Sequence, residues 1–208
     1  MKLNKKLLVI TTIIILLPII IGLIFWEQLP AEMATHWGTD NEPDGWTSKI
    51  FTVFGIPAVI AVLHIVCLLV TYADPKKSNI GQKAMGIVYW ILPATSIAVM
   101  SATYAYALGM EVNIGMICCL LMGIIFIALG NYLPKAKLNY TFGYKIPWTL
   151  NSDENWNKTH RLAGWLMVIC GFAFIINAFI LSKYIFVVCF AVAIIPIIYS
   201  YILYKKGI

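Results

Sequence analysis

The sequence has few charged residues, and acidic ones are the scarcest. Asp, Glu, Lys and Arg make up 12% of the 208 residues, and nine of them are acidic. Soluble domains carry about twice that share of charge. Together with 61% apolar residues, this scarcity excludes a soluble globular domain, a disordered chain and a coiled coil. It also excludes direct nucleic-acid binding, which needs a basic soluble face.

Disulfide patterns and catalytic motifs are missing as well. The five cysteines are an odd number and contain no CxxC spacing, so we expect small packing residues and no disulfides. The chain has no HExxH, no GxSxG and no paired Asp in neighbouring apolar segments, so no nucleophile has a visible base. We therefore expect that the protein is not an enzyme and that it needs no cofactor.

What the sequence does contain is a set of six charge-free apolar stretches. They run from 7 to 26, 50 to 72, 84 to 110, 112 to 134, 162 to 182 and 184 to 204. A helix of about 20 residues crosses the hydrocarbon core, and backbone groups in lipid must be bonded within their own segment. The sequence predicts an all-α polytopic membrane protein with six transmembrane helices. The first stretch is too long for the core of a signal peptide, and we expect it to be retained.

The positions of the charges predict the orientation. With six spans both termini lie on one side, and thirteen of the 15 basic residues then fall on that side. The other side holds Lys49 and Lys183 but six of the nine acidic residues. The positive-inside rule therefore predicts that both termini are cytoplasmic.

The loops divide the chain into a short and a long part. We expect one membrane domain over 1–208, with a two-span segment at 1–72 and a four-span segment at 84–208. The two long loops are an extracytoplasmic one at 27–49 and a cytoplasmic one at 135–161, and long connections are where function concentrates. Gly123 and Gly130 do not form a GxxxG motif, so the oligomeric state stays open.

The outer loop, 27–49, combines acidic residues with aromatic ones. Pro43, Asp44 and Gly45 predict a turn, and Trp46 stands close to the second span, where Trp is typically an interface anchor. A second interpretation is recognition, because an acidic and aromatic surface would attract a cationic or amphipathic peptide.

His36 in this loop has two interpretations. On a helix, His36 and Asp40 would share a face, and with Glu32 they could hold a zinc ion. No second histidine is near, so we favour a hydrogen bond of His36 that orders the loop.

The inner loop, 135–161, is rich in aromatic residues. One interpretation is a juxtamembrane segment attracted to anionic lipid. The density of Tyr and Trp goes beyond that need and favours an ordered cytoplasmic platform. Asn151, Ser152 and Asp153 offer a helix cap with Glu154 in the first turn, so a helix from about Asp153 should run into the fifth span and place Trp156 and His160 on one face.

Two sequence motifs resemble the SdpI family of bacterial membrane proteins, including the short domain that precedes the family core. The first motif is Leu29-Pro30, Thr35-His36-Trp37 and Pro43-Asp44-Gly45. The second is Gly130-Asn131, Asn139, Gly143, Pro147-Trp148-Thr149-Leu150, Trp156 and Thr159-His160-Arg161-Leu162-Ala163-Gly164. The chain departs from the family at Lys145, where Arg is usual and could grip a carboxylate or phosphate in two places.

This resemblance implies a protein of the bacterial cytoplasmic membrane that gives immunity to a secreted, membrane-active peptide toxin. It also implies signalling, in which the protein sequesters a cytosolic transcriptional repressor. The residues expected to bind toxin in the outer loop are His36, Trp37, Asp44 and Trp46. The residues expected to serve signalling or structure at the inner loop are Asn131, Asn139, Gly143, Lys145, Pro147, Trp148, Thr149, Trp156, Thr159, His160 and Arg161.

A small-molecule or peptide transporter is the alternative function. Ion-coupled transporters usually carry ionisable residues within their spans, and here His64 is the titratable polar residue found there. We favour a helix–helix hydrogen bond of His64 over a proton relay.

Overall fold

Six helices in the structure, a computed structural model that describes residues 2–208, are long and apolar enough to span a membrane. They are α1 (Lys5–Ile24), α2 (Ile56–Ala73) with the π-helical turn η1 (Phe51–Gly55) before it, α3 (Gln82–Ala107), α4 (Ile114–Tyr132) with the 3₁₀ turn η3 (Leu133–Lys135) after it, α6 (Asp153–Ile180) and α7 (Ile185–Lys205). The six predicted spans are therefore confirmed. The predicted helix into the fifth span is confirmed too, because α6 begins at Asp153 with the Ser152 side chain as its N-cap.

The outer loop contradicts the all-α expectation. It forms an antiparallel hairpin of β1 (Glu32–Trp37) and β2 (Pro43–Ser48), with Ala34 opposite Trp46. Threonine and tryptophan in both strands favour extended structure. A single two-stranded ribbon is marginally stable by itself, so this one depends on its contacts with the helices.

The predicted turn at Pro43, Asp44 and Gly45 is also wrong. These residues begin β2, with Pro43 opposite Trp37, and the chain reverses just before them. The Gly38 N–H donates to the Glu42 carbonyl at 2.9 Å, and Asn41 takes the left-handed conformation with φ of 66°. Asn tolerates that conformation better than most residues, so it supplies the bend.

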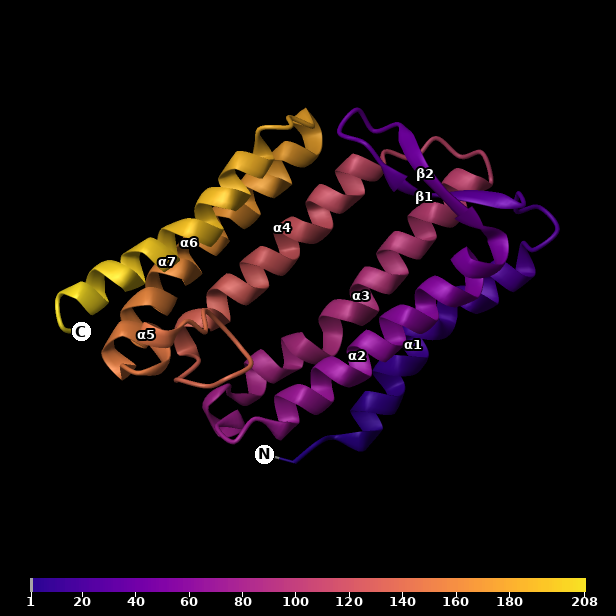
Figure 1. The fold of residues 1–208 in the computed structure, drawn as a ribbon. Helices are drawn as coiled ribbons and strands as arrows, with labels where there is room; N and C mark the ends of the chain where they lie inside the picture. Colours follow the sequence, from indigo (N-terminus) through magenta and orange to yellow (C-terminus); the bar gives the residue numbers. More distant parts are fainter. Residues whose placement is uncertain (1) are drawn as a thin grey trace.

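The spanning helices form two groups that stand side by side (Figure 1). Helix α1 packs on α2 and α3, and α6 packs on α4 and α7. The hairpin lies at one end of the bundle, and the two labelled termini lie toward the other. This other end, with the 74–81 connection and the 136–152 loop, is called the basic end below, because the thirteen basic residues counted above belong to it.

Helices α4 and α6 approach each other at two pairs of glycines. A Cβ on Gly130 would stand 2.7 Å from the Gly164 carbonyl oxygen, and a Cβ on Gly171 would stand 2.7 Å from that of Gly123. The glycines are seven residues apart in each helix and so share a face. Small residues let helix backbones touch in a membrane, where packing replaces the hydrophobic effect as the driving force. The glycines thus pair within one chain.

Polar side chains inside the bundle bond between helices. The Thr11 hydroxyl in α1 and His64 Nε2 in α2 are 2.8 Å apart, and the Ser96 hydroxyl in α3 donates to the Ile15 carbonyl at 2.9 Å. The predicted helix–helix hydrogen bond of His64 is therefore confirmed. Large apolar side chains such as Phe179 and Phe190 are exposed on the outer surface, as contact with lipid requires.

Candidate functional site

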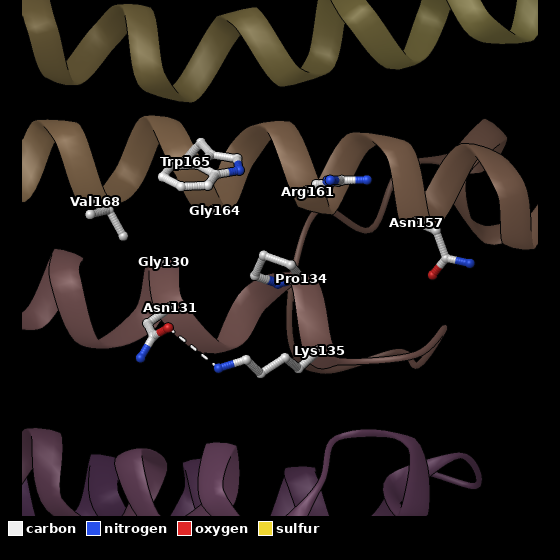
Figure 2. A pocket seen from close by; sticks show the side chains of 9 residues that line it. All are labelled: Gly130, Asn131, Pro134, Lys135, Asn157, Arg161, Gly164, Trp165 and Val168. Carbon is white, nitrogen blue, oxygen red and sulfur yellow. Dashed lines mark hydrogen bonds between the residues drawn. The ribbon is translucent and has the colours of Figure 1, made fainter.

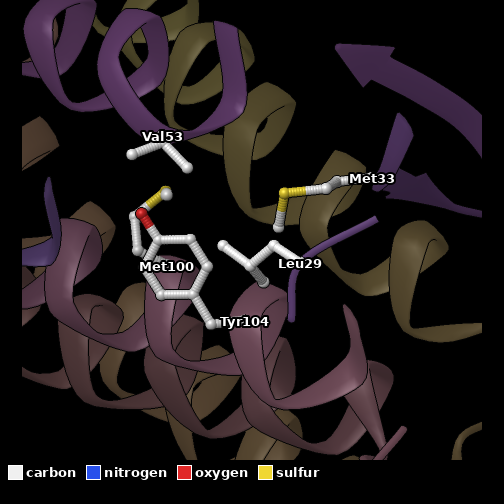
Figure 3. Close-up of a cluster of buried hydrophobic side chains, with 5 residues drawn as sticks. All are labelled: Leu29, Met33, Val53, Met100 and Tyr104. Carbon is white, nitrogen blue, oxygen red and sulfur yellow. The ribbon is translucent and has the colours of Figure 1, made fainter. Parts of the chain in front are cut away.

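The base of the hairpin rests on a buried apolar cluster (Figure 3). It consists of Leu29 and Met33 from the hairpin side, Val53 from η1, and Met100 and Tyr104 from α3. Each of these side chains is at most 3% exposed. The cluster joins the hairpin to both α2 and α3, so the hairpin is a fixed part of the bundle and not a free loop.

Two further contacts hold the tip of the hairpin and the end of β1 next to it. The Trp37 ring meets the Tyr106 ring edge to face, with 5.6 Å between centroids. At the tip, the Gly115 N–H at the start of α4 donates to Asn41 Oδ1 at 2.7 Å. The hairpin therefore touches both helix groups.

The opposite face of the hairpin presents three of the four predicted toxin-binding residues. His36 Nδ1 pairs with Asp44 Oδ1 across the strands, and these side chains are 73% and 54% exposed. Trp46 is 54% exposed. The fourth residue, Trp37, turns inward to Tyr106. The sequence analysis did not predict the strands and so did not separate the exposed residues from Trp37. The alternation of side chains along a strand is the signal that would have separated them.

The geometry does not assemble the metal site that a helix would have made. His36 pairs with Asp44, and Asp40 instead accepts the Glu42 N–H at 3.1 Å. Among residues 2–208, no three His, Cys, Asp or Glu side chains gather closely enough to hold an ion.

An open hollow of about 670 Å³ lies beside the hairpin tip. Asn41 and Glu42 line it from the hairpin, and Tyr106, Met110 and Glu111 line it from α3 and the connection to α4. Two carboxylates next to aromatic and thioether groups suit a cationic, amphipathic ligand.

At the basic end, the inner loop is organised by a buried carboxylate. Asp74, which is 3% exposed, accepts hydrogen bonds from the Lys76 N–H at 2.7 Å, the Tyr140 N–H at 2.8 Å and the Thr141 hydroxyl at 2.9 Å. Three donors satisfy a buried charge that would otherwise be costly. Asp74 directly follows α2. These bonds therefore connect the helix group of α1, α2 and α3 to the loop between α4 and α6. Sequence reasoning missed this role.

Asn139 closes the loop from inside. Its amide group donates to the Lys137 and Phe142 carbonyls at 2.9 and 3.1 Å, and its oxygen accepts the N–H groups of Thr141 and Phe142 at 3.0 and 2.6 Å. The side chain is fully buried. Asn139 is thus the scaffold of a compact turn.

Trp156 and His160 form the centre of the platform. Both are fully buried, and their rings stack with 3.8 Å between centroids. The Trp156 indole donates to the Ala136 carbonyl at 2.8 Å. The Tyr144 N–H donates to His160 Nε2 at 2.9 Å, so Nδ1 carries the proton and donates to the Trp156 carbonyl at 2.8 Å. The imidazole is therefore neutral. Its bond with the Tyr144 N–H ties the loop to α6, and its bond with the Trp156 carbonyl fixes the ring within that helix.

Gly143 is required where the loop crosses this imidazole. Its φ of 119° lies in a region that favours glycine, and a Cβ there would collide with the His160 ring. The absent side chain lets the Tyr144 backbone reach Nε2.

The short helix α5 (Pro147–Leu150) covers the end of α7. The buried Thr149 hydroxyl donates to the Tyr144 carbonyl at 2.7 Å and accepts the Ile146 N–H at 3.1 Å. Trp148 stacks on Tyr204. The Tyr144 hydroxyl donates to the Val192 carbonyl at 3.0 Å, and burial raises the pKa of Tyr144, so it stays a donor.

Asn155 joins α6 to α7 and the C-terminus. Its amide donates to the Ser200 carbonyl at 3.0 Å and the Ile208 carbonyl at 3.2 Å, and its oxygen accepts the Thr159 and Ser200 hydroxyls at 3.1 and 2.7 Å. Sequence reasoning named Thr159 but missed Asn155, because nothing near it in the sequence indicates the partner on α7.

Nine of the eleven predicted inner-loop residues fall into two sets, and the other two, Gly143 and Trp148, are half-buried. The fully buried ones are Asn139, Thr149, Trp156, Thr159 and His160. The exposed ones are Asn131, Lys145, Pro147 and Arg161. The burial of the first set favours a packing role for it, and a partner would reach the second.

Comparisons with known proteins bear out the resemblance to the SdpI family. Residues 135–200 match the SdpI/YfhL protein family, and residues 13–61 match a domain of unknown function (DUF1648). The chain is 29% identical over 206 residues to the Immunity protein SdpI of Bacillus subtilis (strain 168). The aligned region covers 95% of this chain and 96% of that protein. No solved structure matches the chain. The first match contains the platform from its loop to α7, and the second contains the hairpin.

We predict that Gly143→Ala destabilises the protein more than Gly81→Ala. Both glycines have positive φ, but a Cβ at Gly81 meets nothing within 4 Å, whereas one at Gly143 meets His160. The clash should cost about 1–3 kcal/mol beyond the shared backbone strain. Thermal unfolding in detergent micelles and limited proteolysis of the 136–152 loop measure the difference. Equal melting temperatures for the two variants would contradict the packing that we describe.

Proposed function

We propose that this chain is an immunity protein of the bacterial cytoplasmic membrane, which protects the producing cell against a secreted, membrane-active peptide toxin. The observation that carries the proposal is the likeness to an immunity protein along 95% of the chain, through both the hairpin and the platform. Six apolar helices place the protein in a membrane. Protection of this kind rests on binding and needs no catalytic group.

The proposal includes an orientation with the hairpin outside the cell and both termini in the cytoplasm. Thirteen of the 15 basic residues lie at the end away from the hairpin, and the positive-inside rule favours the cytoplasm for that end. A secreted toxin would then meet the hairpin first.

Cysteine labelling tests the orientation. In a variant without the five native cysteines, we expect Thr39→Cys to react in intact cells with a membrane-impermeant maleimide, because Thr39 is exposed at the hairpin tip. Asn151→Cys, which is exposed at the basic end, should react after the cells are opened. The reverse pattern would show that the orientation is wrong.

We propose that the peptide contacts the outward face of the hairpin, made of His36, Asp44 and Trp46, and the hollow beside its tip. An exposed aromatic ring beside carboxylates supports this choice, because Trp is a frequent anchor of interfaces and acidic groups attract cationic partners. The cluster under the hairpin keeps this face rigid, which lowers the entropy lost on binding.

Survival of a sensitive bacterium tests this part. Cells that lack immunity genes and express the chain should outlive empty-vector cells when challenged with a panel of purified secreted bacteriocin peptides. Trp46→Ala and Asp44→Asn should each reduce the tolerated peptide concentration about tenfold at unchanged protein level. Trp90→Ala and Asp153→Asn are matched controls, since Trp90 is 47% exposed on α3 and Asp153 lies at the basic end.

Protection by the chain together with full protection by the Trp46→Ala, Asp44→Asn double variant would move recognition into the spans. Failure of the unmodified chain against every peptide would contradict immunity itself. The two results thus separate the binding face from the function.

We propose in addition that the basic end captures a cytosolic repressor when toxin is bound. The fully buried platform residues support this surface from below. Exposed side chains such as Lys145 and Pro147 can contact a soluble protein. Lys145 Nζ donates to the Thr141 carbonyl at 3.1 Å and is exposed.

Toxin-induced transcription tests the capture. Lys145→Gln with Pro147→Ala should abolish induction and leave protein level and protection normal. His160→Ala should lower all three, because it removes two buried hydrogen bonds. Unchanged induction in the Lys145, Pro147 variant would rule this surface out.

A further inference from the structure

A groove of about 500 Å³ lies between α4 and α6 at the basic end (Figure 2). It is separate from the hairpin and from the buried platform. Gly130 and Gly164, one of the two contact pairs, form part of its wall. Because neither residue has a side chain, the helices touch there while the surface above them stays hollow.

The lining of the groove at its basic end is polar and cationic. Arg161 and Asn157 come from α6, and Asn131 and Lys135 come from the end of α4 and from η3. None of the lining residues is acidic. Figure 2 shows these four side chains around the same opening.

The two cations are not neutralised by the protein. The Arg161 guanidinium makes no hydrogen bond and no ion pair with any of the residues 2–208. Lys135 Nζ donates to Asn131 Oδ1 at 3.3 Å and lies over the Tyr132 ring, so it too lacks an anion. Like charges left together next to a membrane attract an anion of matching size.

The lining becomes apolar toward the middle of the span. Trp165 and Val168 follow Arg161 along α6, and Trp165 is 66% exposed. Tryptophan is typical of the level where lipid head groups meet acyl chains. The groove therefore offers cations and amides at one end and an apolar track at the other, which is the polarity of a phospholipid.

We propose that this groove binds an anionic phospholipid, with its phosphate group between Arg161 and Lys135 and an acyl chain along Trp165 and Val168. The guanidinium provides two parallel N–H donors for phosphate oxygens, Lys135 adds a point charge, and the Asn157 amide is a further donor. The lipid bridges α4 and α6 over the glycine contact. The proposal does not depend on the immunity function.

Native mass spectrometry of the purified protein with added lipid tests this site. We expect phosphatidylglycerol to bind more tightly than phosphatidylcholine. Arg161→Gln and Lys135→Gln should each weaken phosphatidylglycerol binding about tenfold, because each removes a charge-assisted bond. Lys158→Gln is the matched control: it removes one positive charge from the same helix, but Lys158 pairs with Glu154 at 2.7 Å and lies outside the groove.

Thermal unfolding in detergent without lipid shows whether each variant folds. If either Arg161→Gln or Lys135→Gln fails to fold, the other variant still tests the site. Equal binding of phosphatidylglycerol by both variants and the parent would overturn the site. An equal loss in Lys158→Gln would also overturn it, since that would indicate general attraction to a basic surface. Inorganic phosphate in millimolar excess should not displace the lipid. Complete displacement would show that free phosphate, and not lipid, is the ligand.

Discussion

The structure of the basic end depends on one constraint, the backbone contact between α4 and α6. Two glycine pairs bring the helices within reach of each other's carbonyl groups, so the end of η3 and the start of α6 must lie close together. The chain between them, 136–152, has no room to extend and folds back under the bundle. Its polar backbone then needs partners away from water, and the buried side chains of Asn139, Thr149 and His160 supply them. Replacing a glycine of either pair would push α4 and α6 apart and so displace the loop that they hold.

The two ends of the bundle are stabilised in different ways. At the hairpin end, apolar side chains and one aromatic pair attach a short ribbon to α3. At the basic end, buried hydrogen bonds dominate, and each has a short, defined geometry. Apolar contact tolerates small shifts, whereas a buried polar group that loses its partner costs about 1–3 kcal/mol. The platform therefore tolerates fewer residue types at its buried positions than the hairpin end does. This accounts for the residue types of the second motif, where Gly143, Thr149 and His160 each perform one geometric task.

Much of the fold follows from the sequence, and the failures have clear physical causes. The spans are set by the lack of charge over 20 or more residues, which no tertiary contact can override in lipid. A helix cap within residues 151–153 follows from local chemistry, and the structure shows that Ser152 is the capping residue. The hairpin was missed because its strands are short and their pairing depends on α3, which lies far away in the sequence. Asp74 was missed because a single acid in a short loop looks like a solvated charge, and its donors, Tyr140 and Thr141, belong to another loop. The resemblance pointed to the platform residues, but burial was needed to separate those that build it from those that face outward.

The links between the two helix groups limit how any signal could cross the membrane. At the hairpin end, Asn41 accepts the Gly115 N–H at the start of α4, although the hairpin itself belongs to the α1–α2 part of the chain. At the basic end, Asp74 and the cluster around Tyr89, which Phe142 packs against, make the corresponding link. Between these points each helix packs mainly within its own group. A ligand on the hairpin can change the basic end only if it favours one relative placement of the groups over another. The contacts that would register such a change are those of Asp74, because its three donors come from both groups and its carboxylate has no other way to stay satisfied in a buried position.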